Sequence, residues 1–312
     1  MLRVLVTSIG GEIGFSIARI LHQEYKDLFL LGCDVKDDNI GQVLCDEVII
    51  SPYADTKDYK NFILNTIKKY NIDIVIPVSD LEVKTFWKDN LMQDKIIASK
   101  TIIVDKNTVE LSMDKFHTIN FLKKHHLPFP ETILANQTDL TQINYPVIIK
   151  PRFGQGSKNI KEVYFKDEFP KNCLNNEYII QELLSTTQKE YTCCVFSNNQ
   201  KIRNIIMKRT LVCGRTGYGE VVENEEIKQY VLDISKKLHL KGSINLQLRV
   251  TNRGPVLFEI NPRFSSTVMF REKLGFRDLI WSIQEKMGED LHDYICNNSG
   301  IKFFRDSQEY LV

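Results

Sequence analysis

The chain has 312 residues, of which 43% are hydrophobic and 26% are charged, and its 41 basic residues nearly balance its 40 acidic ones. This composition is typical of a globular protein with a packed core and room for two or three units. Because the charges cancel, the chain has no overall basic footprint for nucleic acid, and we expect no nucleic-acid partner. No apolar run approaches the length of about 20 residues that crosses a bilayer, so we expect no membrane partner.

The seven cysteines are scattered along the chain, without CxxC or Cys/His spacing. An odd and scattered set argues against a disulfide framework and a structural zinc site, and favours reduced packing residues. The first apolar run is short and leads directly into a glycine loop, which differs from the pattern of a signal peptide. We therefore expect a cytoplasmic protein.

Residues 1–110 alternate between strand and helix patterns. The predicted strands are residues 4–7, 28–33 and 72–78, and the predicted helices are residues 15–25 and 59–70. Apolar runs of strand length that alternate with amphipathic helices predict a parallel sheet. We expect a small doubly wound α/β domain over this segment.

Short strands and glycine turns dominate the rest of the chain. Helices are predicted at residues 114–125, at residues 224–238 with Asn224 as the N-cap, and over one long stretch at residues 267–287. Strands are predicted at residues 147–150, 178–181, 191–196 and 201–207, with a tight turn at Asn198-Asn199.

Residues 243–263 predict an antiparallel hairpin with one apolar and one polar face, because side chains alternate along a strand. The apolar face is assigned Ile244, Leu246, Leu248 and Val250 from the first strand, and Val256, Phe258 and Ile260 from the second. A three-residue turn at residues 252–254 sets Thr251 opposite Pro255, Gln247 opposite Glu259, and Asn245 opposite Asn261.

Three oxygen-bearing side chains converge on the polar face of this hairpin: Gln247, Glu259 and Asn261. Hard oxygen ligands with a single carboxylate fit Mg²⁺, which fills its other positions with water and phosphate oxygens. Arg263 follows at the strand exit, where it is suited to meet a transferring phosphoryl group. The alternative is an ordinary solvated face of an amphipathic hairpin.

Phe258-Glu259-Ile260-Asn261-Pro262-Arg263 resembles the metal-binding segment of ATP-grasp enzymes, most closely that of the carbamoyl-phosphate synthetase large chain. The resemblance implies that Gln247, Glu259 and Asn261 hold Mg²⁺, for which Mn²⁺ can substitute, between the ATP phosphates. It also implies that Arg263 faces the γ-phosphate and the acyl-phosphate intermediate.

The resemblance continues backward along the chain and implies an ATP site. Phosphate contacts would come from Lys115, Lys150 and Lys208, and from a flexible glycine-rich loop with Gly154, Gln155, Gly156 and Ser157. Glu182 and the backbone of Leu183 and Leu184 would face the adenine edge, and Glu190 would accept from the ribose hydroxyls. The implied fold is ATP-grasp, with a Rossmann-like pre-ATP-grasp domain at 1–110 and two lobes at 111–184 and 185–312.

The implied activity is an ATP-dependent carboxylate–amine or carboxylate–thiol ligase that works through an acyl phosphate. Its partners would be small-molecule carboxylates and amines, and a homodimer is the default expectation. Candidate contacts for the substrate carboxylate are Arg215, Tyr218 and Arg271. Carbamoyl-phosphate synthetase has two such modules and this chain has room for one, which is a departure from that enzyme. A synthase of that type, or another carboxylate kinase, is therefore the alternative rather than the first expectation.

The glycines near the N-terminus leave an alternative of another class open. Gly10, Gly11 and Gly14 follow the first strand and Asp34 ends the second, as in a dinucleotide-binding fold, although the spacing departs from GxGxxG. A nicotinamide-dependent oxidoreductase therefore remains an alternative. An inactive nucleotide-binding subunit is a separate alternative. Residues 79–82 resemble a substrate-side loop of ATP-grasp relatives, but fit a helix N-cap with first-turn acids equally well.

Overall fold

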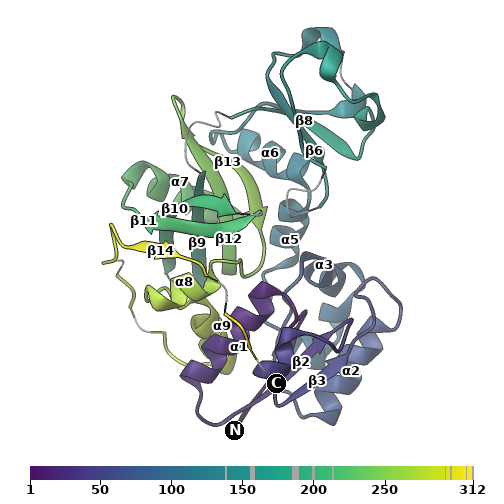
Figure 1. Cartoon of the computed structure of the whole chain (residues 1–312), viewed down its shortest axis with the longest axis vertical. Helices are drawn as coiled ribbons and strands as arrows, with labels where there is room; N and C mark the ends of the chain where they lie inside the picture. The colour runs from purple at the N-terminus through teal and green to yellow at the C-terminus, as the bar shows by residue number, and fades with distance from the viewer. Residues whose placement is uncertain are drawn as a thin grey trace.

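The computed structural model describes residues 1–137, 139–154, 159–184, 190–198, 201–212, 214–291, 293–295, 297–306 and 308–310. Three β-sheets lie along the long axis of the molecule, with the N-terminal sheet at one end and a small lobe at the other (Figure 1). Each sheet is built from one of the predicted segments 1–110, 111–184 and 185–312, whose boundaries stay a prediction. No helix in the described ranges combines the length and apolar character of a bilayer crossing.

The N-terminal sheet is parallel, as predicted, with strand order β3-β2-β1-β4. Its strands are β1 (Leu2–Thr7), β2 (Leu28–Asp34), β3 (Glu47–Ile50) and β4 (Ile74–Ile76). The helices of this part are α1 (Glu12–Glu24), α2 (Tyr59–Lys69), α3 (Asp80–Lys88), α4 (Lys95–Lys100) and α5 (Lys106–Met113). The sequence did not predict β3, α4 or α5, and it offered the start of α3 only as one of two alternatives, because these elements are too short for a clear hydrophobic period. The three helices begin instead at capping side chains, Ser79, Asp94 and Asp105.

A four-stranded antiparallel sheet forms the small lobe, with order β5-β8-β6-β7. Helix α6 (Lys115–Lys124) leads into β5 (Thr132–Leu134), β6 (Val147–Pro151), β7 (Lys161–Val163) and β8 (Tyr178–Glu182). Val147, Ile149 and Ile180 pack with Phe169 in its core. The predicted strands at 147–150 and 178–181 are confirmed.

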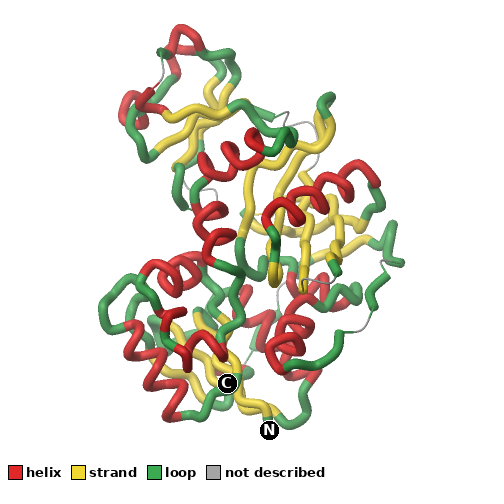
Figure 2. The backbone as a smooth tube through the Cα atoms, turned by 180° about the vertical axis from the view of Figure 1, so that it is seen from behind, coloured by secondary structure: helices red, strands yellow, loops and turns green. Residues whose placement is uncertain are grey.

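The third sheet has six strands in the order β13-β12-β9-β10-β11-β14, all paired antiparallel. They are β9 (Glu190–Asn198), β10 (Ile202–Val212), β11 (Arg215–Val221), β12 (Lys241–Thr251), β13 (Gly254–Asn261) and β14 (Lys302–Phe304). Helix α7 (Glu225–Leu238) crosses one face (Figure 2), and Asn224 caps it by accepting from Ile227 N at 2.9 Å, as predicted. Strand β10 runs past its predicted end at residue 207, and Asn199 of the predicted turn lies outside the described residues.

The predicted single helix at residues 267–287 is wrong. It is two helices, α8 (Val268–Lys273) and α9 (Asp278–Met287), separated at Gly275, whose φ of 77° ends the first helix. Val268, Leu279 and Ile283 share one core with β1, β4 and α1. The C-terminal helices therefore pack against the N-terminal sheet.

The predicted register of the hairpin is correct near the site and wrong near the turn. Gln247 lies opposite Glu259 and Asn245 opposite Asn261, but Thr251 lies opposite Gly254. A β-bulge explains the difference, because Phe258 is an extra residue between the pairs Gln247–Glu259 and Leu248–Leu257. Leu257 consequently joins the buried core with Ile260, while Phe258 turns to the opposite, cavity-lining face.

The described cysteines are free thiols: Cys33, Cys45, Cys173, Cys193 and Cys194. All but Cys45 are buried. Burial raises the pKa of the Cys45 thiol to about 12, so it stays protonated and unreactive near neutral pH. Cys213 and Cys296 lie outside the described residues.

Candidate active site

A cavity of about 410 Å³ opens between the small lobe and the six-stranded sheet. Strands β6 and β8 form one wall, strands β9, β10, β12 and β13 form the other, and Ile13 of α1 lies at one end. Most of the predicted ATP, metal and catalytic residues line it: Lys115, Lys150, Gly154, Glu182, Leu183, Leu184, Glu190, Gln247, Glu259, Asn261 and Arg263. Lys208 does not line it, and Gln155, Gly156 and Ser157 lie outside the described residues.

Gln247, Glu259 and Asn261 lie side by side on β12 and β13. With the Gln247 amide oriented to suit its neighbours, its nitrogen donates to Glu259 Oε2 at 3.1 Å and its oxygen accepts from Asn261 Nδ2 at 3.1 Å. This donor set consists of one carboxylate and two amides, which fits Mg²⁺ whose remaining ligands are phosphate oxygens and water. The described part of the chain holds no cluster of three or more acidic, histidine or cysteine side chains suited to a metal.

Two buried lysines face this hairpin. Asp114 caps α6 by accepting from Phe116 N at 3.0 Å, which places Lys115 in the first turn, and Lys115 Nζ donates to Gly154 O at 2.6 Å. Lys150 is the residue before the last of β6; it is 4% exposed, and its Nζ donates to Phe258 O at 3.4 Å.

Burial lowers the pKa of Lys150 to about 8; Glu259 opposes this shift and Lys115 adds to it. Burial disfavours the charged form of this lysine. A bound polyphosphate would supply a counter-charge and so favour the charged form. The two lysines and the carboxylate of Glu259 therefore bring charges of both signs to the lining of the cavity.

The cation that β10 contributes is Arg209, and the prediction of Lys208 as a site residue is not supported by its position. Arg209 is 7% exposed and lines the cavity, with its Nη2 3.3 Å from the Gln247 oxygen in the orientation described above. Lys208 alternates with Arg209 and shares the face of Ile206, which packs under α7. Of these two adjacent residues, the prediction therefore chose the one that faces away from the cavity.

Glu190, the predicted ribose acceptor, lies in an ion-pair chain. It accepts from Arg209 Nε at 3.0 Å and stands 3.8 Å from Arg249 Nη2. Arg249 Nη1 in turn donates to Leu184 O at 3.1 Å, at the start of the interlobe connection. Arg249 thus connects the predicted ribose end of the cavity to the predicted adenine end.

The predicted adenine segment lies at the end of β8. The Glu182 carboxylate accepts two bonds from Arg253 Nη2, at 2.6 and 2.7 Å, and a third from Glu131 N at 3.2 Å. Because Arg253 belongs to the turn between β12 and β13, this ion pair joins the two walls of the cavity. Leu183 N donates to Pro146 O at 3.4 Å.

A model of the ATP-grasp domain matches residues 112–267, half of the chain. The chain belongs to the ATP-grasp family. The match includes Lys115, Lys150 and the complete β12–β13 hairpin.

Relatives of known name are similar to parts of this ATP-grasp chain. The carbamoyl phosphate synthase large chain of Saccharolobus solfataricus is 24% identical over 230 residues, which cover 65% of this chain and 22% of the relative. The same enzyme of Clostridium acetobutylicum is 22% identical over 278 residues, which cover 81% of this chain and 25% of the relative. The match to these relatives thus covers only about a quarter of their length.

Solved structures share the fold over almost the whole chain. An N5-carboxyaminoimidazole synthetase from Staphylococcus aureus complexed with ADP has a TM-score of 0.75 at 16% identity, covering 94% of this chain and 79% of that chain. The biotin carboxylase domain of 2-oxoglutarate carboxylase from Hydrogenobacter thermophilus has a TM-score of 0.76 at 14% identity, covering 96% and 72%. The ATP-grasp fold with an N-terminal Rossmann-like sheet, predicted above, is therefore confirmed.

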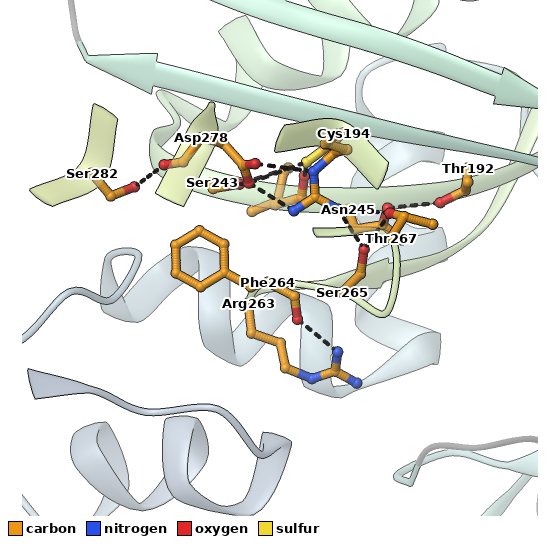
Figure 3. Close-up of polar contacts among 12 residues, drawn as sticks. Thr192, Cys194, Ser243, Asn245, Arg263, Phe264, Ser265, Thr267, Asp278 and Ser282 are labelled. Carbon is orange, nitrogen blue, oxygen red and sulfur yellow. Dashed lines mark hydrogen bonds and ion pairs between the residues drawn. The ribbon is translucent and has the colours of Figure 1, made fainter. Parts of the chain in front are cut away.

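Arg263 follows the ATP-grasp hairpin and also lines the cavity. Its Nε and Nη2 donate to Asp80 Oδ1 and Oδ2 at 2.8 and 2.9 Å. Its Nη1 donates to Phe264 O at 2.9 Å (Figure 3). Residues 79–82 form an N-cap: Ser79 Oγ accepts from Glu82 N at 3.2 Å, and Ser79 N donates to Glu82 Oε2 at 2.8 Å. The capping reading of this segment is confirmed.

The three predicted carboxylate contacts differ in position. Arg215 lines the cavity and its Nη1 lies 3.2 Å from Glu12 Oε2. Tyr218 stacks on Phe304 outside the cavity lining, with ring centroids 6.2 Å apart. Arg271 is wrong as a candidate, because it is fully buried and paired with Asp278 at 2.8 Å.

A buried polar cluster adjoins the cavity through Ser265, which also lines it. Asp278 Oδ2 accepts from Ser243 Oγ at 2.6 Å, and Ser265 Oγ lies 2.9 Å from Thr267 Oγ1 (Figure 3). The guanidinium of Arg271 bonds both hydroxyls, to Ser265 Oγ at 2.8 Å and to Thr267 Oγ1 at 2.7 Å. This cluster fixes the chain directly after Arg263.

Two of the three glycines near the N-terminus, Gly10 and Gly14, have structural reasons to be glycine. A Cβ on Gly14 would lie 2.6 Å from Ser8 O, and one on Gly10 would lie 2.8 Å from Asn39 Cβ. Asp34, which would face a ribose in a dinucleotide site, accepts instead from Gly10 N at 2.9 Å. The loop is closed on itself by these contacts.

Proposed function

We propose that this protein is an ATP-dependent carboxylate ligase, which phosphorylates a small-molecule carboxylate and passes the acyl group to an amine or a thiol. The main support is the single cavity in which Gln247, Glu259 and Asn261 face Lys115 and Lys150. Oxygen ligands and cations thus line the same cavity, an arrangement suited to a nucleoside triphosphate with its divalent metal.

Gln247, Glu259 and Asn261 would hold Mg²⁺, or Mn²⁺ in its place. When bound, the metal ion would neutralise charge that develops on the phosphates. Lys115, Lys150 and Arg209 would bind the phosphate oxygens from the opposite wall and from β10. Glu190 and the segment 182–184 would hold the ribose and adenine.

The reaction has two steps in this proposal. A carboxylate oxygen of the acid attacks the γ-phosphorus of ATP, and the bond to the β-phosphate oxygen breaks to release ADP. The amine nitrogen then attacks the acyl carbon, phosphate leaves, and the amine gives up one proton. The protein contributes chiefly orientation and charge stabilisation, with Arg263 at the cavity end where the acid would enter.

The decisive experiment is a screen of ADP release by the purified protein with Mg²⁺ and ATP, against pools of carboxylates and amines. A ligase releases ADP only when both an acid and an acceptor are present. A carboxylate kinase releases ADP with the acid alone. Absence of ADP release and of ATP binding would contradict the whole assignment.

Bicarbonate belongs in that screen as the smallest acid. The Hydrogenobacter thermophilus carboxylase domain was solved with MgADP and bicarbonate, and it shares this fold. A carboxylase that activates bicarbonate is thus the second candidate. That domain was also solved as a dimer, which supports the proposal of a homodimer here; light scattering of the purified protein tests it.

A further inference from the structure

Arg263 is anchored by an acid from a distant part of the chain. Its guanidinium forms a parallel two-point pair with Asp80, and each of the two side chains is only 13% exposed. A planar bidentate pair fixes the direction of a guanidinium as well as neutralising its charge. The orientation of Arg263 at the cavity is therefore set by α3 of the N-terminal part.

Asp80 is itself held on a rigid support. It is the first residue of α3, directly after Ser79, which forms a capping box with Glu82. The Glu82 carboxylate is 5% exposed and also accepts from Ser8 Oγ at 2.9 Å and from Tyr59 OH at 3.2 Å. These bonds tie the start of α3 to the β1–α1 loop and to α2, and the helix N-terminus favours the negative charge of Asp80.

We propose that Asp80 is a positioning residue that aims Arg263 at the transferring phosphoryl group. This inference rests on the proposed function, because Asp80 is given no contact with a ligand of its own. A free arginine side chain loses rotamer freedom when it engages a transition state, whereas the ion pair with Asp80 supplies that order in advance. A guanidinium has N–H groups on more than one edge, so Arg263 can keep Asp80 and still face an anion.

If the ion pair between Asp80 and Arg263 had a structural role alone, its removal would have a different effect. Its loss would lower the stability of the protein and leave the affinity for a phosphoryl transition state unchanged. Positioning predicts the opposite, namely a selective loss of affinity for the transition-state form. The two roles can therefore be separated by binding measurements that need no knowledge of the substrate.

The probe is MgADP with and without fluoroaluminate, which imitates a planar transferring phosphoryl group. We expect the wild-type protein to bind MgADP more tightly when fluoroaluminate is present. Asp80→Asn should lose about tenfold or more of that gain, because a small misplacement of the guanidinium is costly. Its affinity for MgADP alone should change less than about twofold, since Asp80 lies away from the nucleotide-holding residues. Calorimetry measures both.

Two variants control the experiment. Asp89→Asn removes an exposed acid at the C-terminal end of the same helix, and should keep the full gain. Arg263→Lys should lose the gain, and Asp80→Asn added to it should have no further effect, since the two residues act as one unit. If Asp80→Asn folds poorly, Asp80→Glu keeps the charge but displaces the arginine, and should lose part of the gain.

The possible outcomes separate a failure of the proposed function from a failure of the role of Asp80. A wild-type protein without any gain from fluoroaluminate overturns the phosphoryl-transfer function together with the role of Asp80. A wild-type gain that Asp80→Asn retains in full, or a loss that adds to that of Arg263→Lys, overturns the role of Asp80 and leaves the proposed function intact.

Discussion

Lys150 lies in the wall of the cavity with its side chain almost entirely buried. Its nearest acids, Glu259 and Glu190, only partly offset the effect of burial, so its pKa falls to about 8. Below that pH the folded protein contains a buried charge that a bound polyphosphate would neutralise. The nucleotide and the proton on Lys150 therefore favour each other's binding.

We predict that MgATP affinity falls as the pH rises through 8, because free Lys150 loses its proton there. At pH 8, binding should take up a fraction of a proton, which calorimetry in two buffers of different ionisation enthalpy measures. Lys150→Arg stays charged and should show neither effect. The free energy of unfolding changes in the opposite direction. The unfolded chain holds the Lys150 proton up to its usual pKa of about 10.4, whereas the folded chain loses it near pH 8. Burial of the charge therefore destabilises the fold below pH 8, and this destabilisation shrinks as the pH rises above 8.

Arg209 and Lys208 provide a matched pair of neighbouring cations. Arg209→Met should weaken MgATP binding by about tenfold or more, because it removes a charge from the cavity and leaves Glu190 with one cation fewer. Lys208→Met should change the affinity less than about twofold, since its side chain lies on the α7 face. Equal effects of the two substitutions would show that the nucleotide does not bind against this face of β10.

The sequence could locate the right strand for this cation but not the right residue. Two adjacent basic residues at a strand end point to opposite faces, and the choice depends on how the strand pairs with its neighbours. Here Arg209 pairs with Glu190 across β9 and β10, and both point into the cavity. The sequence did predict Glu190 as a site residue. A search for the basic residue opposite Glu190 would have favoured Arg209.

At the scale of elements, the β12–β13 hairpin was predictable at its functional end. The predicted turn is one residue longer than the observed one, and the bulge at Phe258 adds that residue back within the arm, so Gln247 meets Glu259 as expected. The bulge at Phe258 was not predictable, because alternation alone assigns Phe258 to the core. The bonds of Asp80 to Arg263 were not predictable either, since 183 residues separate the two.

We predict that Gly14→Ala destabilises the protein by about 1–3 kcal/mol, because the new methyl group meets backbone rather than a mobile side chain. The nearest atoms are Ser8 O at 2.6 Å and Ile9 Cα at 2.9 Å, so α1 must move away from the loop before it. This exceeds the helix-propensity gain of about 0.5–1 kcal/mol that alanine brings. Urea denaturation measures the difference.

Gly11→Ala is the matched control from the same loop. Its Cβ would lie 3.4 Å from Ser8 O, close to ordinary contact, and its φ of −83° suits any residue. Its stability should stay within about 0.5 kcal/mol of the wild type. An unchanged stability of Gly14→Ala would mean that α1 adapts freely to its loop.

At the scale of the whole molecule, the N-terminal sheet and the six-stranded sheet depend on one another, whereas the small lobe has a core of its own. The C-terminal helices α8 and α9 complete the core under β1 and β4, and Val83 and Val109 complete the core of the six-stranded sheet. Periodicity predicts that such helices bury one face, but not which sheet receives it. The overall order of the three segments was readable from the motifs, whereas their shared cores were not.

We predict that MgATP raises the melting temperature of the whole chain, whereas NAD does not. A ligand at a hundred times its dissociation constant stabilises the folded form by about 2.7 kcal/mol. Glu259→Ala should melt near the wild-type temperature without ligand and lose the part of the shift that EDTA abolishes. Its ADP release should fall below detection. A shift by MgATP that survives both EDTA and Glu259→Ala would contradict the metal assignment.

The extra residue at Phe258 determines where this hairpin tolerates changes in length. Residues added or removed at the tip, around Asn252 and Arg253, leave the spacing from bulge to metal face untouched. Loss of Phe258 itself would straighten the strand and still leave Leu257 opposite Leu248 and Glu259 opposite Gln247, so Glu259 would stay on the cavity face. Distant relatives with active sites should therefore vary in the length of the tip and in the presence of the bulge, while keeping Gln247 and Glu259 opposite each other.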